Sequence, residues 1–186
     1  MNKSESTDPL IVIRSKLQHL AKNSFHAAGS ESTFATGGLL PDAPSPGLIV
    51  DGIDSLSFPL SETQAQQLKE QCELAPFGRR DKTILDTSVR KTWHLPPAKF
   101  LIGNAAFQQY LDTAVMDRLQ KAFHLRSENA LRLSLYKLLL YESGSFFLPH
   151  RDTEKESGMF GTLVVQLPST FTGGQLVVQH DDKTTT

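Results

Sequence analysis

Residues 131–152 read LRLSLYKLLLYESGSFFLPHRD, and this stretch decides the fold class. Leu131, Leu133 and Leu135 alternate with polar residues, and the run then becomes apolar on both faces through Tyr141, as in a strand that enters a covered sheet. Residues 142–145 predict a turn, and residues 146–152, 161–167 and 174–179 predict three further strands joined by loops rich in Gly, Pro, Ser and Thr. The last third of the chain is therefore expected to be rich in strands.

The middle of the chain alternates between strand and helix signals. Residues 48–50 and 53–58 predict short strands, and residues 83–93 predict an extended segment. Ser61 and Gln64 match a capping box, which predicts a helix ending near residue 74. A second helix is expected to start at Asn104, with Phe107, Leu111 and Val115 on one face. Helices followed by consecutive strands indicate an α+β domain with an antiparallel sheet.

Residues 1–46 differ in composition from the rest of the chain. Asp8 and Pro9 resemble the start of a helix, and Leu10, Ile13 and Leu17 recur at helical spacing. Residues 30–47 are rich in Gly, Pro, Ser and Thr, which indicates a linker. We therefore predict an N-terminal helix and flexible linker over residues 1–46, with few contacts to a domain over residues 47–186.

Composition excludes several classes of protein. The 186 residues suffice for one ordinary globular domain, and the net charge of −1 disfavours nucleic acid and membrane surfaces as partners. The single cysteine, Cys72, allows neither an intrachain disulfide nor a zinc ribbon. No signal peptide or membrane span is visible, so an intracellular protein, cytoplasmic or nuclear, is expected.

The candidate site is the sequence His150-Arg151-Asp152. Residues i and i+2 of a strand project from the same face, so the imidazole and the carboxylate would converge while Arg151 points away. This pair would supply two of the three ligands of a facial triad for Fe(II). A surface His–Asp pair is the alternative, and His180-Asp181-Asp182 is a second match to the same spacing.

The residues around this pair carry a family resemblance. An ordered run of Tyr141, a glycine turn, His150 to Asp152, and Gly173-Gly174 resembles the Fe(II)/2-oxoglutarate-dependent dioxygenases, most of all the prolyl 4-hydroxylase-like branch. Two earlier segments, 75–78 and 86–93, are similar to the region before that family's core. The resemblance covers residues 47–180. It implies Fe(II) and 2-oxoglutarate as cofactor and cosubstrate, ascorbate as a candidate reductant, and a peptide or small molecule as substrate.

Residue by residue, the resemblance makes His150 and Asp152 iron ligands and Tyr141 a hydrogen-bond partner of 2-oxoglutarate. A buried core tyrosine is the alternative for Tyr141. Gln166 falls where relatives often carry a second tyrosine facing the cosubstrate, although a solvent-facing strand residue explains it as well. Arg90 and Trp93 lie in a segment that would cover the substrate, and a solvated charge and a core aromatic are their alternatives.

The family pattern continues to a distal histidine and to an Arg or Lys that pairs with 2-oxoglutarate, and this chain stops before both. The expected fold is therefore an incomplete double-stranded β-helix (jelly roll) with supporting helices. His180 is more simply an exposed strand-end histidine than a third ligand. We expect weak Fe(II) binding and no turnover, and the open sheet edge could bind a partner or a second copy. The alternatives are a non-catalytic fragment or pseudo-enzyme acting as a binding module, and a metal-free interaction module.

Overall fold

The computed structural model describes residues 8–18, 34–79, 82–125, 130–152, 154 and 157–185, with only the backbone described for residues 8–18. The elements follow in chain order: β1 (Asp8–Gln18), β2 (Leu48–Val50), α1 (Glu62–Gln71), β3 (Glu73–Leu74), β4 (Phe77–Arg79), β5 (Lys82–Ile84), β6 (Arg90–Lys91), β7 (Trp93–Leu95), η1 (Pro97–Lys99), β8 (Phe100–Ile102), α2 (Ala105–Tyr110), η2 (Leu111–Val115), α3 (Met116–Ala122), β9 (Ala130–Tyr141), β10 (Phe146–Phe147), β11 (Met159–Gln166), β12 (Val178–His180) and β13 (Lys183–Thr185).

A five-stranded sheet organises the fold, with the strand order β11-β1-β9-β7-β3. All its neighbouring strands are antiparallel. The other described strands form four two-stranded pairs, β10-β6, β12-β13, β2-β8 and β4-β5. The prediction of an α+β fold with antiparallel strands is confirmed, and the described strands close no barrel.

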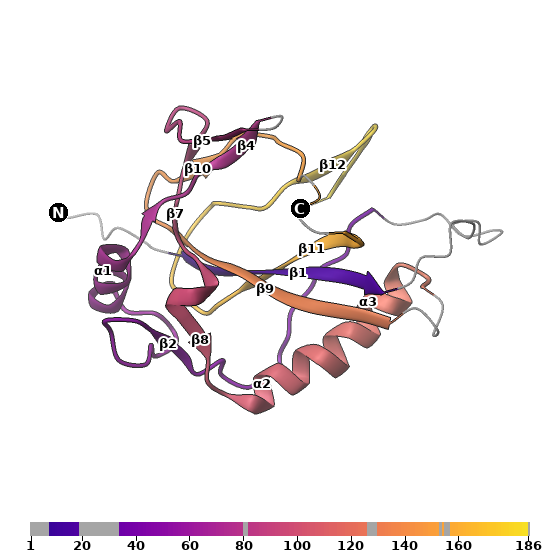
Figure 1. The fold of residues 1–186 in the computed structure, drawn as a ribbon, viewed down its shortest axis with the longest axis horizontal. Helices are drawn as coiled ribbons and strands as arrows, with labels where there is room; N and C mark the ends of the chain where they lie inside the picture. The colour runs from indigo at the N-terminus through magenta and orange to yellow at the C-terminus, as the bar shows by residue number, and fades with distance from the viewer. Residues whose placement is uncertain are drawn as a thin grey trace.

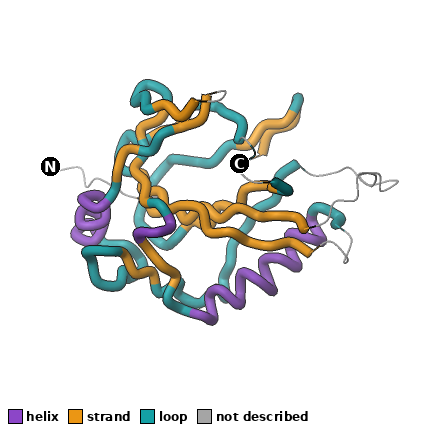
Figure 2. Tube along the Cα trace, viewed as in Figure 1, coloured by secondary structure: helices purple, strands orange, loops and turns teal. Residues whose placement is uncertain are grey.

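Helices cover one face of the main sheet. In Figures 1 and 2 the helical stretch from α2 to α3 runs along one side of β9 and β1, and β10 with the β4–β5 hairpin lies on the other side. The main core joins Phe107, Leu111 and Val115 of the helical stretch to Leu138 and Leu140 of β9. Because side chains alternate along a strand, the residues between them face away from the helices. We call that opposite side of the sheet the site face; it carries His94, Leu139, Tyr141 and Thr162.

Both predicted helices are confirmed, and their N-caps explain where they begin. Ser61 Oγ accepts a hydrogen bond from the Gln64 amide at 3.3 Å, and Asn104 Oδ1 accepts one from the Ala106 amide at 3.0 Å. The second helix contains one π-helical turn, η2. There Thr113 Oγ1 donates to the Gln109 carbonyl at 2.7 Å, which competes with the regular backbone ladder.

The predicted N-terminal helix is wrong. Residues 8–18 form β1, which lies between β9 and β11 and pairs with both. The consecutive β-branched residues Ile11, Val12 and Ile13 favour a strand, and two flanking strands supply backbone partners that an isolated helix lacks. Residues 19–33, the rest of the predicted helix and the start of the linker, lie outside the described residues.

The expectation that residues 1–46 make few contacts is also wrong. Residues 34–47 have no regular strand or helix, as predicted for a linker, yet they are docked. Leu40 and Ala43 pack against the main core, and the Pro46 carbonyl accepts a hydrogen bond from the Asn104 amide at 3.2 Å. A segment of low apolar content is held here chiefly by its backbone groups.

Three predicted strands are shorter than expected or missing. Residues 53–58 contain only an isolated bridge at Ile53, and the segment from 174 to 179 is irregular until β12 starts at Val178. The strand predicted over residues 146–152 ends at Phe147. Pro149 has no amide hydrogen for a strand ladder, which is a physical reason for this early end.

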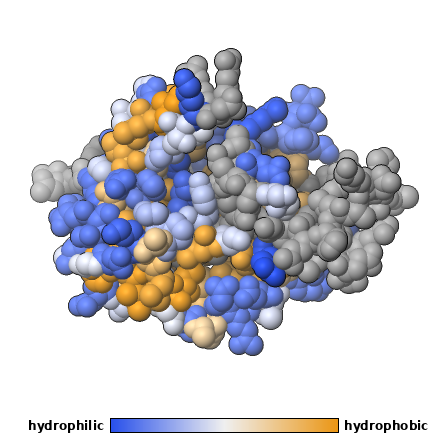
Figure 3. All heavy atoms as spheres, in the orientation of Figure 1, coloured by the Kyte–Doolittle hydropathy of each residue, from blue (hydrophilic) through white to orange (hydrophobic). Residues whose placement is uncertain are grey.

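The surface mixes polar and apolar areas. Figure 3 shows hydrophobic patches separated by hydrophilic side chains on the face in view. Ile49 of β2 and Leu101 of β8 are an exposed cross-strand pair, 42% and 51% accessible. None of the helices in the described part of the chain is both long enough and apolar enough to span a membrane.

Candidate metal and anion site

His150 and Asp152 lie close together in the loop that follows β10. His150 Nε2 is 3.8 Å from Asp152 Oδ1. The prediction that one strand would present both side chains is wrong, because both residues follow the end of β10. The prediction that the imidazole and the carboxylate converge is confirmed.

Neighbouring groups orient both side chains. His150 Nδ1 donates to the Leu148 carbonyl at 2.9 Å, which leaves Nε2 with a free lone pair facing Asp152. The His150 ring is also stacked on Phe147, with centroids 3.5 Å apart and an angle of 18° between the planes. Asp152 Oδ2 accepts a hydrogen bond of 2.7 Å from Thr162 Oγ1 of β11. Oδ1 is therefore the oxygen that faces the imidazole.

This arrangement fits a metal ion in one respect and needs a small adjustment in another. Metal-binding histidines usually donate their second ring N–H to a carbonyl or carboxylate, as His150 does to Leu148. Two adjacent ligands of a facial site, each about 2.1 Å from the ion, lie about 3.0 Å apart, so the observed 3.8 Å would have to shorten by a small movement of the exposed side chains when an ion binds. Within the described ranges, no group of three His, Cys, Asp or Glu side chains could hold a metal ion together.

Arg90 lies beside this pair. It is 6% exposed, and its backbone pairs with that of Phe147 across β6 and β10. The guanidinium carbon is 4.4 Å from the centre of the Phe147 ring, which also stacks on the imidazole of His150. Arg90 Nη1 donates to the Pro76 carbonyl at 3.0 Å, while Nε is buried without a hydrogen-bond partner.

Burial lowers the pKa of Arg90, while Tyr141, Tyr136 and Asp152 act against this shift. The largest of these opposing contributions is that of Tyr141, through its negative charge when ionised. The structure therefore brings four of the predicted site residues into one neighbourhood, namely His150, Asp152, Arg90 and Tyr141.

Sequence reasoning missed several residues of the same neighbourhood. His94 pairs with Leu139 across β7 and β9, and its Nδ1 is buried without a hydrogen-bond partner. Burial lowers the pKa of His94, the positive charges of Lys137 and Arg90 lower it further, and Glu73 opposes them. Lys137 is another residue of this neighbourhood that the sequence analysis did not select. The sequence could have indicated it, because Lys137 directly precedes the apolar residues 138–140 of a predicted strand.

A bulge in β9 adds a second tyrosine to the site face. The register between β1 and β9 shifts between Val12 and Ile13, so that Tyr136 is the extra residue. Tyr136 and Tyr141 both pack against the small cluster of Ala75 and Leu139. Neither the bulge nor its position follows from the alternating pattern of the strand.

The remaining predicted residues lie elsewhere. Gln166 is exposed at the end of β11, and His180 stacks on Phe34 in the β12–β13 hairpin. Trp93 packs against the main core on the helix-covered face, with Lys69 Nζ 5.1 Å from its ring centre. This matches the core aromatic that was the alternative for Trp93.

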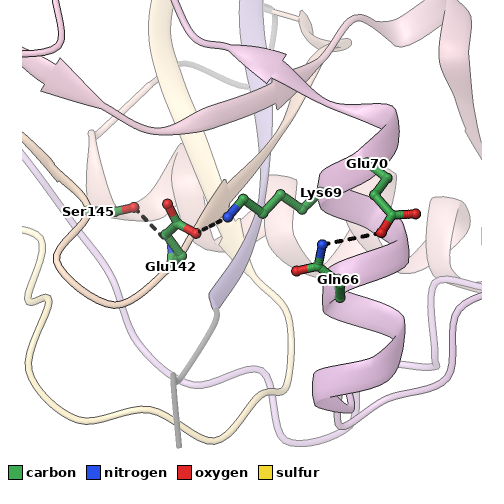
Figure 4. Close-up of polar contacts among 5 residues, drawn as sticks. All are labelled: Gln66, Lys69, Glu70, Glu142 and Ser145. Carbon is green, nitrogen blue, oxygen red and sulfur yellow. Dashed lines mark hydrogen bonds and ion pairs between the residues drawn. The ribbon is translucent and has the colours of Figure 1, made fainter.

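Beside Trp93 lies a separate ion pair. Lys69 Nζ contacts Glu142 Oε2 at 2.5 Å, and the Glu142 amide donates to Ser145 Oγ (Figure 4). Burial would raise the pKa of Glu142, but the hydrogen bond from Lys69 and the charges of Lys69 and Lys91 outweigh it, so the pKa is lowered. This pair ties α1 to the turn after β9.

The one cysteine is not a candidate nucleophile. Burial raises the pKa of Cys72 to about 12. A thiol with such a pKa is almost entirely protonated near neutral pH, and the thiolate is the reactive form. Cys72 packs against the main core as a small hydrophobic residue.

Comparison with protein-family models, curated proteins and solved structures finds no match to this chain.

Proposed function

We propose that this chain is an Fe(II)/2-oxoglutarate-dependent dioxygenase-like protein with an incomplete double-stranded β-helix. In this proposal His150 Nε2 and Asp152 Oδ1 bind the metal, and a peptide or small molecule is the substrate. The observation that carries it is the oriented His150–Asp152 pair, with each side chain held by a second hydrogen bond. A surface His–Asp pair, the alternative that the sequence left open, would need neither hydrogen bond, although both side chains are exposed, 43% for His150 and 51% for Asp152.

In this proposal each residue near the metal has its own role. The Leu148 carbonyl and the Phe147 ring fix the imidazole, and Thr162 fixes the carboxylate. When bound, Fe(II) would supply open coordination positions for a chelating cosubstrate and dioxygen. Tyr141 and Arg90 lie beside the pair and could donate hydrogen bonds to such a cosubstrate.

Metal binding is the first test. The full chain, purified without metal, is titrated anaerobically with Fe(II), and the same titration is run on His150→Ala and Asp152→Asn. His124→Asn is the matched control, because His124 is an exposed helix-end residue with φ of 51°, a conformation that Asn tolerates. We expect binding to weaken at least tenfold in the two site variants and to stay unchanged in the control. Equal binding by all four proteins would overturn the proposal.

Turnover is the second test. Succinate formation from 2-oxoglutarate is measured with Fe(II) and ascorbate for the chain and for His150→Ala. Iron-dependent succinate that disappears in His150→Ala supports the enzyme. Because the described residues bring no group of three ligands together, we expect metal binding through His150 without succinate, the behaviour of a non-catalytic metal-binding module.

A further inference from the structure

The main sheet has two edges, and they differ in length. In the order β11-β1-β9-β7-β3, the described strands leave the outer side of β3 and the outer side of β11 without a neighbouring strand (Figure 1). Strand β3 has only two residues, whereas β11 has eight. A short edge strand is one of the ways in which proteins keep a sheet from pairing with other molecules. Length therefore protects the edge at β3 and leaves the edge at β11 unprotected.

The composition of β11 gives this edge no other protection. Its sequence, MFGTLVVQ, contains no charged residue and no proline, the residue types that commonly block an edge. A β-bulge can also block an edge, and here the register with β1 shifts so that Phe160 is the extra residue. This bulge lies near the start of the strand, and residues 161–166 pair regularly with β1. Residues 162–165 are therefore a regular, uncharged part of the edge.

The exposure of β11 agrees with an edge that the described strands leave uncovered. Residues 138–140 of β9, which has a strand on each side, are all buried, whereas Leu163 and Val164 of β11 are only half-buried. Leu163 and Val165 contact the main core on the helix-covered side, and Val164 shares the site face with Thr162. One more strand along β11 would cover apolar side chains on both faces of the sheet.

We propose that two copies of this chain form a dimer in which β11 pairs antiparallel with β11 of the second copy, with Val164 opposite Val164. In this register, Leu163 of each copy lies opposite Val165 of the other. Residues opposite each other share a face of the sheet, so these leucine–valine pairs join the two main cores on the helix-covered side. One uncharged sequence supplies both partners, which makes the edge complementary to itself.

The side chains favour this register over its neighbour. A pairing centred on Leu163 would place Val165 opposite Gly161, which has no side chain to contact it. The register centred on Val164 leaves neither Leu163 nor Val165 without an apolar neighbour across the interface. A two-fold pairing of this kind uses the same edge on both copies and therefore closes at two molecules.

The dimer does not depend on the metal of the proposed function. The exposed His150 and Asp152 could also join two copies through a shared ion, and such a dimer would need the metal. All measurements are therefore made in EDTA. His150→Ala should dimerise like the parent chain. Dimerisation that requires added metal or the His150 side chain would overturn pairing along β11 and leave the metal site in place.

Analytical ultracentrifugation of the 186-residue chain over a range of concentrations is the test. We expect a monomer–dimer equilibrium. Val164→Lys should weaken dimerisation about tenfold or more, because it removes two apolar side chains from the interface and sets two like charges opposite each other. Val177→Lys is the matched control, since Val177 is 53% exposed outside the main sheet, and it should leave dimerisation unchanged.

Three outcomes would overturn the proposal. They are a parent chain that stays monomeric at every concentration, a Val164→Lys variant that dimerises as tightly as the parent, and assembly that continues beyond the dimer, which a closed two-fold pair does not allow.

Val164→Cys keeps the test decisive if Val164→Lys fails to fold. Opposite residues of antiparallel strands have Cβ atoms about 5 Å apart, close to the reach of a disulfide, so mild oxidation should cross-link two copies. Cys72 adds little background, because burial raises its pKa to about 12 and keeps the thiol protonated. Val177→Cys is the control, and cross-linking that is equal in both variants would overturn the proposal.

Discussion

The most instructive residues are two ionisable groups that are at least partly buried. Arg90 and Glu142 are ionisable groups on β6 and just after β9, and their neighbours differ. Glu142 has its cation, Lys69, in direct contact, whereas the Nε of Arg90 has no hydrogen-bond partner. A satisfied, partly buried pair is typical of a structural role, and an unsatisfied buried donor is typical of a binding site.

The Glu142 pair makes a prediction about stability and pH. Because the folded protein lowers the pKa of Glu142, its carboxylate stabilises the fold above the ordinary pKa of Glu, about 4.3, and this contribution is lost as the pH falls. Glu142→Gln should therefore lower the free energy of unfolding by about 1 kcal/mol at pH 7. The difference from the parent chain should shrink below about pH 4.3.

Urea denaturation at several pH values measures this effect. The matched control is Glu70→Gln, which alters an exposed carboxylate whose contact is Gln66 on the same helix (Figure 4). We expect its effect at pH 7 to be smaller, because exposed pairs contribute little. A Glu142→Gln difference that is the same at pH 3 and pH 7 would contradict the prediction.

Site residues differ in how far they could be predicted. The spacing of His150 and Asp152 predicted their convergence, and the resemblance indicated Arg90 and Tyr141. Thr162 orients Asp152 from ten residues further on, and its role depends on where β11 lies. His94 joins the neighbourhood through its pairing with Leu139. Residues that act across strands become visible only when the register of the sheet is known.

At the scale of elements, the capping box of α1 is only half formed. Ser61 Oγ caps the Gln64 amide, but Gln64 Oε1 accepts from the Ser57 amide at 3.3 Å instead of from Ser61. The side chain of Gln64 therefore ties the helix to the preceding loop. The sequence pattern predicted where the helix begins, and the loop decided the second hydrogen bond.

The cap itself can be tested. Ser61→Ala removes the hydroxyl that satisfies a free amide of the first turn, so it should lower the free energy of unfolding by about 1 kcal/mol. Ser55→Ala, in the exposed loop before the helix, is the control and should change it far less. Chemical denaturation of both variants measures the difference. A Ser61→Ala variant as stable as Ser55→Ala would show that the cap contributes nothing measurable.

For the whole molecule, the decisive element is β1. It fills the position between β9 and β11, with Ile11 opposite Leu138 on one side and Val165 on the other. Without it, two long strands would expose unpaired backbone groups along facing edges. The main sheet is therefore complete only with a segment that the sequence pattern assigned to a separate helix.

Deleting residues 1–18 tests this directly. We expect the shortened chain to melt at a clearly lower temperature and to self-associate, because β9 and β11 lose their common partner. Removing residues 1–7 alone, which precede β1, is the control and should change neither property strongly. Thermal melting and size-exclusion chromatography provide the measurements. Unchanged melting after deletion of residues 1–18 would show that β1 adds no stability.

The sequence by itself determined the elements whose signals are local. Caps at Ser61 and Asn104 located the two helices, alternation of apolar residues located the start of β9, and an apolar run between loop residues located β11. These signals depend on neighbours within a few residues, which the sequence contains in full.

Only the tertiary structure decided that residues 8–18 form a strand, and only the tertiary structure decided which residues lie on the site face. The segment has both helical spacing and β-branched residues, and the free backbone edges of β9 and β11 settle the choice in favour of a strand. In the same way, Arg90 and His150 both pack on the Phe147 ring because β6 pairs with β10. Such pairing joins residues about 60 positions apart, and no local pattern encodes which strands will be neighbours.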